Sequence, residues 1–290
     1  MRILKKFNEF ELTYKKIILF AILAGAYTAI MAIIPSAKDT SFTDITISFE
    51  VWILFGTFII MKSKSAKDSA LKCFLFFLIS QPLVYLLQVP FSSLGWELFD
   101  YYKVWFLWTI FTIPMGYIGY YMKKDKWWGL LILAPILLFL GYHYYNFLKE
   151  TIFMFPNHLL STIFCVVTLL IYPIAIFKNH NNKIIGIVLS IVIIITMTIL
   201  SFVNRIDYKT DIMSSGGVLE IVFDDTYKVY FEDRNLGNVY IRYDEGIEDY
   251  LVTAEFTRGG KSNLVLEDSD GNKTTFKLEV NYNKYSIDKK

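Results

Sequence analysis

The chain has 290 residues, of which 54% are hydrophobic and only 19% are charged. A soluble domain usually has about 25% charged residues, so this composition excludes an ordinary soluble protein and indicates an integral membrane protein. The formal net charge of +2 hides an asymmetry, because residues 1–203 have a net charge of +7 and residues 204–290 a net charge of −5. The two parts are therefore expected to lie in different surroundings.

Seven segments approach the roughly 20 mostly apolar residues that a helix needs to cross the hydrocarbon of a bilayer. They are residues 17–34, 45–61, 70–89, 104–122, 127–145, 159–177 and 184–203. The first follows a charged segment and is too long for the apolar region of a cleaved signal peptide, so we interpret it as a retained helix. The predicted fold class is an α-helical multi-pass membrane bundle of about seven transmembrane helices, followed by a small all-β sandwich domain.

The distribution of basic residues predicts the orientation of these helices, because cytoplasmic loops contain an excess of Lys and Arg. Fourteen basic residues fall in the N-terminal segment and in the loops after the second, fourth and sixth spans. The alternate loops contain only three, Lys38, Lys103 and Lys149. The chain is therefore expected in a cell membrane, with the lipid bilayer as its partner, its N-terminus in the cytoplasm and its C-terminus outside. The abundance of Ile, Lys, Asn, Phe and Tyr is typical of low-GC bacteria, which favours a bacterial source.

After residue 203 the continuous apolar pattern gives way to alternating apolar and polar residues, which is typical of half-buried strands. Strands are predicted at residues 218–223, 228–232, 238–244, 252–258, 263–267 and 275–280, and Asp270-Gly271 is a hairpin-turn signal. Short strands at this spacing predict a small sandwich. The predicted organisation is a cytoplasmic segment (1–16), a transmembrane domain (17–203), a linker (204–213), an extracytoplasmic β-sandwich domain (214–285) and a tail (286–290).

The segment 259–281, GGKSNLVLEDSDGNKTTFKLEVN, resembles the last hairpin of bacterial immunoglobulin-like domains. A strand, a glycine-containing turn and a final strand ending in an alternating Val recur in that family. The resemblance covers residues 214–285 and does not include the Cys-Trp-Cys core of antibody domains. It implies a binding or spacing module without catalysis, whose partner is an envelope polymer or protein. The first span, with Ala21, Gly25 and Ala29 at four-residue spacing, faintly resembles the alanine-spaced first helix of substrate-binding subunits in energy-coupling-factor vitamin transporters. The helical part as a whole resembles no family that we recognise.

Glu50 is the most informative residue of the helical part. It lies twelve residues from Lys62 at the inner end of the second span, which corresponds to a depth of about 18 Å. Gln81 lies twelve residues from Ser69 and reaches a similar depth. A hydrogen bond between Glu50 and Gln81 is expected to offset part of the cost of an ionisable group in the bilayer. The alternative is that the second span starts near Phe49 and that Glu50 meets the outer headgroups.

Further polar residues and prolines predict a cavity among the helices. Gln88 and His143 lie in the outer half of their helices, so the predicted substrate-binding residues are Glu50, Gln81, Gln88 and His143. Prolines fall inside four consecutive predicted helices, and kinked helices around polar residues often enclose cavities in transporters. These prolines are Pro82, Pro114, Pro135 and Pro173.

Two other patterns allow alternative interpretations. Ala21, Gly25 and Ala29 form a small-residue face on the first span, which predicts either packing within the chain or a helix–helix partner. His143 and His158 have Glu150 between them, a set that can bind a metal. A structural or interfacial role is favoured because nothing around them has the signature of a metal site, and no metal is expected. Cys73 and Cys165 lie inside apolar runs and are expected to be packing residues.

The sequence contains none of the motifs HExxH, GxSxG and GxxxxGK[ST]. We therefore predict no enzyme, no catalytic residue and no cofactor, and we interpret the basic loops as topology determinants rather than as nucleic-acid sites. The predicted function is small-solute binding or transport by a permease-like protein with an extracytoplasmic immunoglobulin-like domain. The alternative is a cell-envelope scaffold or sensor that presents the β-sandwich as a binding module. An intramembrane enzyme is disfavoured because no Arg occurs between Arg2 and Arg205.

Overall fold

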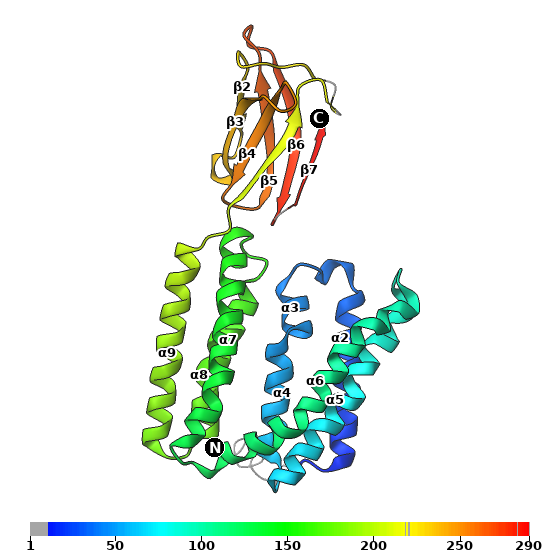
Figure 1. The fold of residues 1–290 in the computed structure, drawn as a ribbon, viewed down its shortest axis with the longest axis vertical. Helices are drawn as coiled ribbons and strands as arrows, with labels where there is room; N and C mark the ends of the chain where they lie inside the picture. The colour runs from blue at the N-terminus through cyan, green and yellow to red at the C-terminus, as the bar shows by residue number, and fades with distance from the viewer. Residues whose placement is uncertain (1–10, 218, 220, 283, 290) are drawn as a thin grey trace. The chain divides into compact units, whose positions relative to one another are not determined.

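The computed structural model describes residues 11–217, 219, 221–282 and 284–289. Helices precede strands along the chain (Figure 1). The internal contacts divide the chain into two units. The helical unit comprises Met1–Tyr145 and Leu160–Met197, and the β unit comprises Asn146–Leu159 and Thr198–Lys290. Most of the predicted N-terminal segment, residues 1–10, lies outside the described residues.

Eight α-helices lie within the described residues. They are α2 (Tyr14–Ile33), α3 (Ser41–Ile47), α4 (Phe49–Lys62), α5 (Ala66–Gln88), α6 (Phe99–Gly119), α7 (Trp128–Phe153), α8 (Leu159–Ile176) and α9 (His180–Val203). Five of them, α2, α5, α7, α8 and α9, are long and apolar enough to cross a membrane, and α3 with α4 makes a sixth if that bent pair is one span. In α6, Lys103 and several Trp and Tyr residues lower the hydropathy. The described helices thus include five candidate spans, where the sequence predicted about seven.

The small-residue face of α2 packs on α5. Ala21 and Ala29 are fully buried, and a Cβ atom added to Gly25 would lie 2.7 Å from the carbonyl oxygen of Ser80. The backbones of the two helices therefore touch at this point, which only small side chains permit. This arrangement corresponds to the packing alternative, in which the face is covered by the chain itself.

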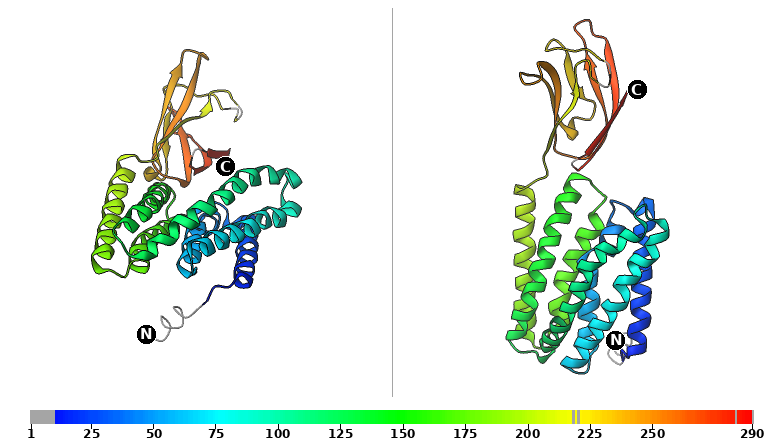
Figure 2. Two further views of the ribbon diagram at one scale, coloured as in Figure 1. Left: turned by 60° about the horizontal axis from the view of Figure 1, so that its bottom comes forward. Right: turned by 45° about the vertical axis from the view of Figure 1, so that its right-hand side comes forward.

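The helices α7, α8 and α9 form a second group. Gly141 of α7 lies against Ile193 of α9, and Gly186 of α9 lies against Pro173 of α8. Two views show these three helices as one group and α2, α5 and α6 as another, with α3 and α4 between them (Figures 1 and 2). The pair α3–α4 therefore has neighbours on both sides.

All four predicted proline positions lie inside helices, namely Pro82 in α5, Pro114 in α6, Pro135 in α7 and Pro173 in α8. Each of these helices continues through its proline. The sharp break lies elsewhere, between α3 and α4, where the helix direction changes by 45°. Ser48 stands at this break in an extended conformation, with φ −71° and ψ 157°. The sequence predicted one span over residues 45–61, with a start near Phe49 as the alternative. The helix α4 does begin at Phe49, but a break from a preceding helix was not predicted.

The β unit contains two antiparallel sheets. Their strands are β1 (Tyr208–Ser214), β2 (Lys228–Phe231), β3 (Gly237–Asp244), β4 (Asp249–Phe256), β5 (Gly260–Glu267), β6 (Lys273–Asn281) and β7 (Lys284–Lys289). One sheet has the order β1-β4-β3 and the other the order β2-β5-β6-β7. The predicted turn at Asp270-Gly271 joins β5 to β6, and Gly271 has a φ of +84°, which glycine adopts at little cost.

The two sheets share one hydrophobic core. In β6 the predicted alternation is confirmed, because Phe276, Leu278 and Val280 are buried while Lys277 and Glu279 between them are exposed. Buried residues of β4 and β5 belong to the same core. The rings of Phe231 in one sheet and Phe256 in the other stack with centroids 5.6 Å apart. The sheets therefore face each other across these side chains.

Three boundaries in the β unit differ from the sequence prediction. The first strand, β1, begins inside the predicted linker 204–213 and ends one residue beyond it, and β7 covers residues 286–289 of the predicted tail. Within the predicted strand 218–223, residues 219 and 221–223 are not in a strand, whereas residues 218 and 220 lie outside the described residues. The backbone groups of Phe223 bond the hydroxyl of Ser215, at 2.8 and 2.9 Å, instead of a neighbouring strand.

Candidate functional site

The break between α3 and α4 places an acidic residue at a helix start. Ser48 precedes the first residue of α4, and its backbone N–H donates to the carbonyl of Asp44 in α3, 2.9 Å away. Glu50 is in the first turn of α4. Unpaired N–H groups and the helix dipole favour a negative charge at this position. The local structure thus prepares the first turn of α4 for a carboxylate.

Glu50 meets His143 inside the helical unit. Its side chain is 0% exposed, and its Oε1 atom lies against Nδ1 of His143 on α7, whose side chain is 20% exposed. Both carboxylate oxygens of Glu50 are buried, and neither accepts a hydrogen bond among the described residues, although Oε1 is in ion-pair contact with His143. An isolated buried carboxylate is costly, so the contact with an imidazole offsets part of that cost. Glu50 therefore lies inside the protein and not at an exposed surface.

Aromatic rings surround the pair formed by Glu50 and His143, named the Glu50–His143 pair below. Phe139 lies against the imidazole of His143, with ring centroids 4.5 Å apart. Phe49 stacks on Trp105 of α6 with centroids 4.8 Å apart, and it also contacts His143 edge-on. Such rings lower the local polarity, which strengthens any interaction between the two ionisable groups.

The helix α8 supplies polar groups to the same region. The hydroxyl of Ser161 donates to a carboxylate oxygen of Asp44 on α3, at 2.7 Å. Cys165 and Tyr172, both buried, lie within electrostatic reach of Glu50. The polar region therefore draws on α3, α4, α7 and α8. Asp44, Ser161 and Tyr172 were not predicted from the sequence. Asp44, an acidic residue six positions before Glu50, was the one available signal.

The structure joins two of the four predicted substrate-binding residues. Glu50 and His143 are in contact, whereas Gln81 and Glu50 form no hydrogen bond. Gln81 is 2% exposed on α5, and its Nε2 atom has no partner among the described residues. Gln88 donates to the carbonyl of Val84 in its own helix, at 2.9 Å. The expected Glu50–Gln81 hydrogen bond was wrong, because equal depth on two helices does not make two side chains face each other.

His158 and Glu150 lie in the β unit and have different partners from His143. The imidazole of His158 is 3.7 Å from the carboxylate of Glu150 on one side and contacts the hydroxyl of Tyr282 on the other. The ring of Phe153 stacks on Tyr282, with centroids 6.1 Å apart. Within the described ranges, no three His, Cys, Asp or Glu side chains converge as metal ligands do. His158 thus joins the segment after α7 to the turn after β6.

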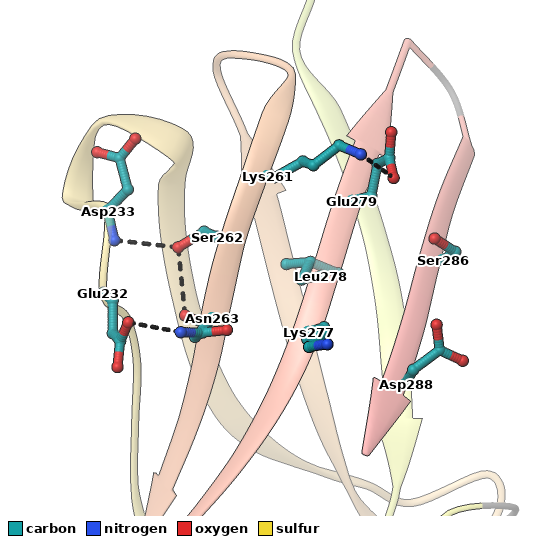
Figure 3. Close-up of a pocket in the computed structure, with 10 residues that line it drawn as sticks. All are labelled: Glu232, Asp233, Lys261, Ser262, Asn263, Lys277, Leu278, Glu279, Ser286 and Asp288. Atoms are coloured by element: carbon teal, nitrogen blue, oxygen red, sulfur yellow. Dashed lines mark hydrogen bonds and ion pairs between the residues drawn. The ribbon is translucent and has the colours of Figure 1, made fainter. Parts of the chain in front are cut away.

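A shallow polar groove of about 530 Å³ crosses the sheet β2-β5-β6-β7 (Figure 3). Its lining is rich in charges of both signs and contains Glu232, Asp233, Lys261, Ser262, Asn263, Lys277, Leu278, Glu279, Ser286 and Asp288. Asn263 donates to Glu232 at 2.7 Å, and Lys261 pairs with Glu279 at 3.0 Å. These contacts hold side chains of neighbouring strands in place. Because the groove is open and polar, its chemistry suits hydrogen bonds to a polar partner.

Comparisons with known proteins find no relative, since no family model, no curated protein and no solved structure matches the chain. Support for a function must therefore come from the residues of this chain. The Glu50–His143 pair is buried, whereas the groove of the β unit is open, so the pair carries the larger cost of removing ionisable groups from water. Ionisable groups inside membrane helices are rare and mark solute or ion pathways.

Proposed function

We propose that this chain is a multi-pass membrane protein that binds and transports a small solute at the α3–α4 break. The observation that supports the proposal is Glu50, fully buried at the break and in contact with His143 from another helix. Secondary transporters often use discontinuous helices, whose ends present a dipole and free backbone groups to the solute. A buried ion pair adds little stability compared with an apolar pair, which favours a functional reason for its presence.

The proposal includes the membrane placement expected from the sequence. Each of α2, α5, α6, α7, α8 and α9 crosses the bilayer of a bacterial cell once, and α3 with α4 makes a seventh, broken crossing. The basic residues on alternate loops support a cytoplasmic N-terminus and an external C-terminus. The acidic β unit is then outside. In this arrangement Glu50 and His143 lie in the outer half of the bundle.

The β unit is proposed to be an immunoglobulin-like sandwich. Constant-type immunoglobulin domains have strands A, B, E and D in one sheet and C, F and G in the other. If β1 corresponds to strand B, the orders β1-β4-β3 and β2-β5-β6 match B-E-D and C-F-G. Strand A is then missing, and β7 is an added strand at the edge beside G. This order, together with the shared core, supports the resemblance of the last hairpin.

Ligand-induced stabilisation tests the transport proposal. Purified full-length protein is heated with each member of a panel of amino acids, nucleosides, sugars, polyamines and B vitamins. A ligand at 100 times its Kd raises the stability of a one-site protein by about 2.7 kcal/mol. We expect at least one member to raise the Tm of the wild type and of Glu97→Gln, an exposed acid on the chain, but not that of Glu50→Gln. A panel that leaves the wild type unshifted, or shifts Glu50→Gln equally, contradicts the proposal.

The groove of the β unit favours a second candidate function, a cell-envelope scaffold or sensor. Its polar lining fits a glycan or a peptide of the envelope, and seven crossings then serve as an anchor. The test is co-sedimentation of the full-length protein in detergent with purified peptidoglycan. Under this candidate Asn263→Ala reduces binding several-fold, whereas Asn238→Ala, an exposed position on the other sheet, does not. Absence of co-sedimentation removes peptidoglycan as the partner.

A further inference from the structure

The contact between Glu50 and His143 requires a proton between the two side chains. A carboxylate oxygen and a neutral imidazole nitrogen both present lone pairs, so they attract each other only when a proton lies between them. Oε1 of Glu50 and Nδ1 of His143 are in such contact. That proton can be the Nδ1–H of a neutral imidazole beside a carboxylate, and the pair then carries one negative charge. With one further proton the pair is a neutral acid with a neutral imidazole, or a carboxylate with an imidazolium, and is uncharged.

Without that further proton, the pair leaves one negative charge inside the helical unit. Glu50 is 0% exposed, and a buried charge without a counter-charge is strongly unfavourable. The titratable groups with a described interaction in this region are an acid, a thiol and a phenol. Among the described residues near it, α3 offers Asp44, α8 offers Cys165 and Tyr172, and the rings from α6 are uncharged. On α5, Cys73 lies against the carbonyl of Gly56, six residues further along α4.

These groups differ from the pair in burial or in charge. Asp44 is half-buried and accepts a hydrogen bond from Ser161. Cys165 and Tyr172 are neutral when protonated and give the pair no compensating charge. The Glu50–His143 pair is therefore the place in this region where one added proton cancels one buried charge.

The two members of the pair differ in access. The side chain of His143 is 20% exposed, whereas that of Glu50 is fully buried. Imidazole has two nitrogens, so it can take up a proton on one side and give one up on the other. A proton from water adds to Nε2 of His143, and the proton on Nδ1 passes to Oε1 of Glu50. The reverse steps return the proton to water, so atoms and charge balance.

We propose that the Glu50–His143 pair binds one exchangeable proton, and that this proton is the coupling ion of the solute transport proposed above. The second half of this inference rests on the proposed function, whereas proton binding by the pair does not. Exchange occurs through His143. Solute movement is then linked to the protonation of Glu50, because this proton changes the net charge of the pair beside the helix break from −1 to 0.

Infrared difference spectroscopy on the full-length protein in lipid nanodiscs tests proton binding directly. Protonated carboxyl groups have their own C=O stretching band, which is followed as the pH is raised stepwise. We expect the wild type to lose one such band as the pH rises. Glu50→Gln removes that transition, Glu97→Gln keeps it, and His143→Gln keeps the band but moves its midpoint by at least one pH unit.

The outcomes separate this inference from the proposed function. A wild-type spectrum with the same pH dependence as that of Glu50→Gln overturns proton binding by the pair, even if the ligand panel still depends on Glu50. An unchanged midpoint in His143→Gln overturns the role of His143. If the band titrates as expected while solute uptake into proteoliposomes is unaffected by a pH gradient, the proton is bound but is not the coupling ion.

Discussion

Single residues set how closely the helices approach. Gly25 of α2 leaves no room for a side chain, because its Cβ would lie 2.7 Å from the carbonyl oxygen of Ser80. Gly56 of α4 is different, since its nearest neighbour would be a ring atom of Phe77 at 3.8 Å, which is ordinary contact. The two glycines therefore form a matched pair for substitution.

We predict that Gly25→Ala destabilises the helical unit by about 1–3 kcal/mol, the usual cost of overpacking. Gly56→Ala is predicted to change the stability by less than about 1 kcal/mol, and to raise it if anything, because Ala is the better helix former. Thermal unfolding in detergent, followed by tryptophan fluorescence, measures both. Equal stability of the two variants would show that α2 and α5 do not touch at Gly25.

At the same scale, the sequence allowed part of the site to be predicted. The spacing from Lys62 placed Glu50 inside the bilayer, and His143 was named independently from its position in the outer half of its helix. Their contact was not predicted, because it depends on how α4 and α7 face each other, and depth alone does not contain that information. The partner chosen instead, Gln81, lies on α5 and makes no hydrogen bond to Glu50.

At the scale of elements, the helix break at Ser48 and the strand β7 were not predicted because each lacks the residues that usually indicate such a feature. The break at Ser48 has neither Pro nor Gly, which are the residues that usually reveal a break. The strand β7 has the sequence KYSIDK, which is too charged to read as a strand, although charged side chains are common on edge strands. Residues 218–223 are the opposite case, because their alternating apolar pattern predicted a strand. No strand forms at the described positions 219 and 221–223, where loop contacts to Ser215 take its place.

The sheet β1-β4-β3 is linked across its strands by ion pairs. Arg242 of β3 contacts Asp244 at 2.6 Å and Asp211 of β1 at 2.9 Å, and Lys209 of β1 contacts Glu255 of β4 at 2.6 Å. The hydrogen bond from Arg242 holds the pKa of Asp244 below its ordinary value of 3.8. The hydrogen bond from Lys209 likewise lowers the pKa of Glu255 from 4.5. Both carboxyl groups therefore stabilise the folded sheet in their charged form.

We predict that this sheet loses stability in acid. The contribution of a carboxyl group with a lowered folded-state pKa is complete above its unfolded-state value and disappears as the pH falls through the folded-state value. Amide hydrogen exchange of the full-length protein, corrected for its intrinsic pH dependence, should accelerate in β1, β3 and β4 below pH 4.5. The double variant Asp244→Asn and Glu255→Gln should show a weaker acceleration. An equal response in both proteins would mean that these ion pairs do not contribute, as many exposed pairs do not.

At the scale of the whole molecule, the membrane orientation remains a prediction from the basic residues. It is tested by single cysteines in a Cys73→Ala and Cys165→Ala background, labelled on intact cells with a maleimide that cannot cross membranes. Ser269→Cys, in the turn between β5 and β6, should be labelled in intact cells. Lys124→Cys, after α6, should be labelled only after the cells are opened. The opposite pattern would invert the proposed topology.

The Glu50–His143 pair is central to the function proposed for the chain. If the two side chains act as one unit, removing either should disturb the protein, and removing the second should add little. A double-mutant cycle of Glu50→Gln, His143→Gln and both together, measured by unfolding in detergent, gives the coupling free energy. We predict about 1–3 kcal/mol, with the double variant less destabilised than the sum of the single variants. A coupling below about 0.5 kcal/mol, the usual result for independent sites, would contradict the account.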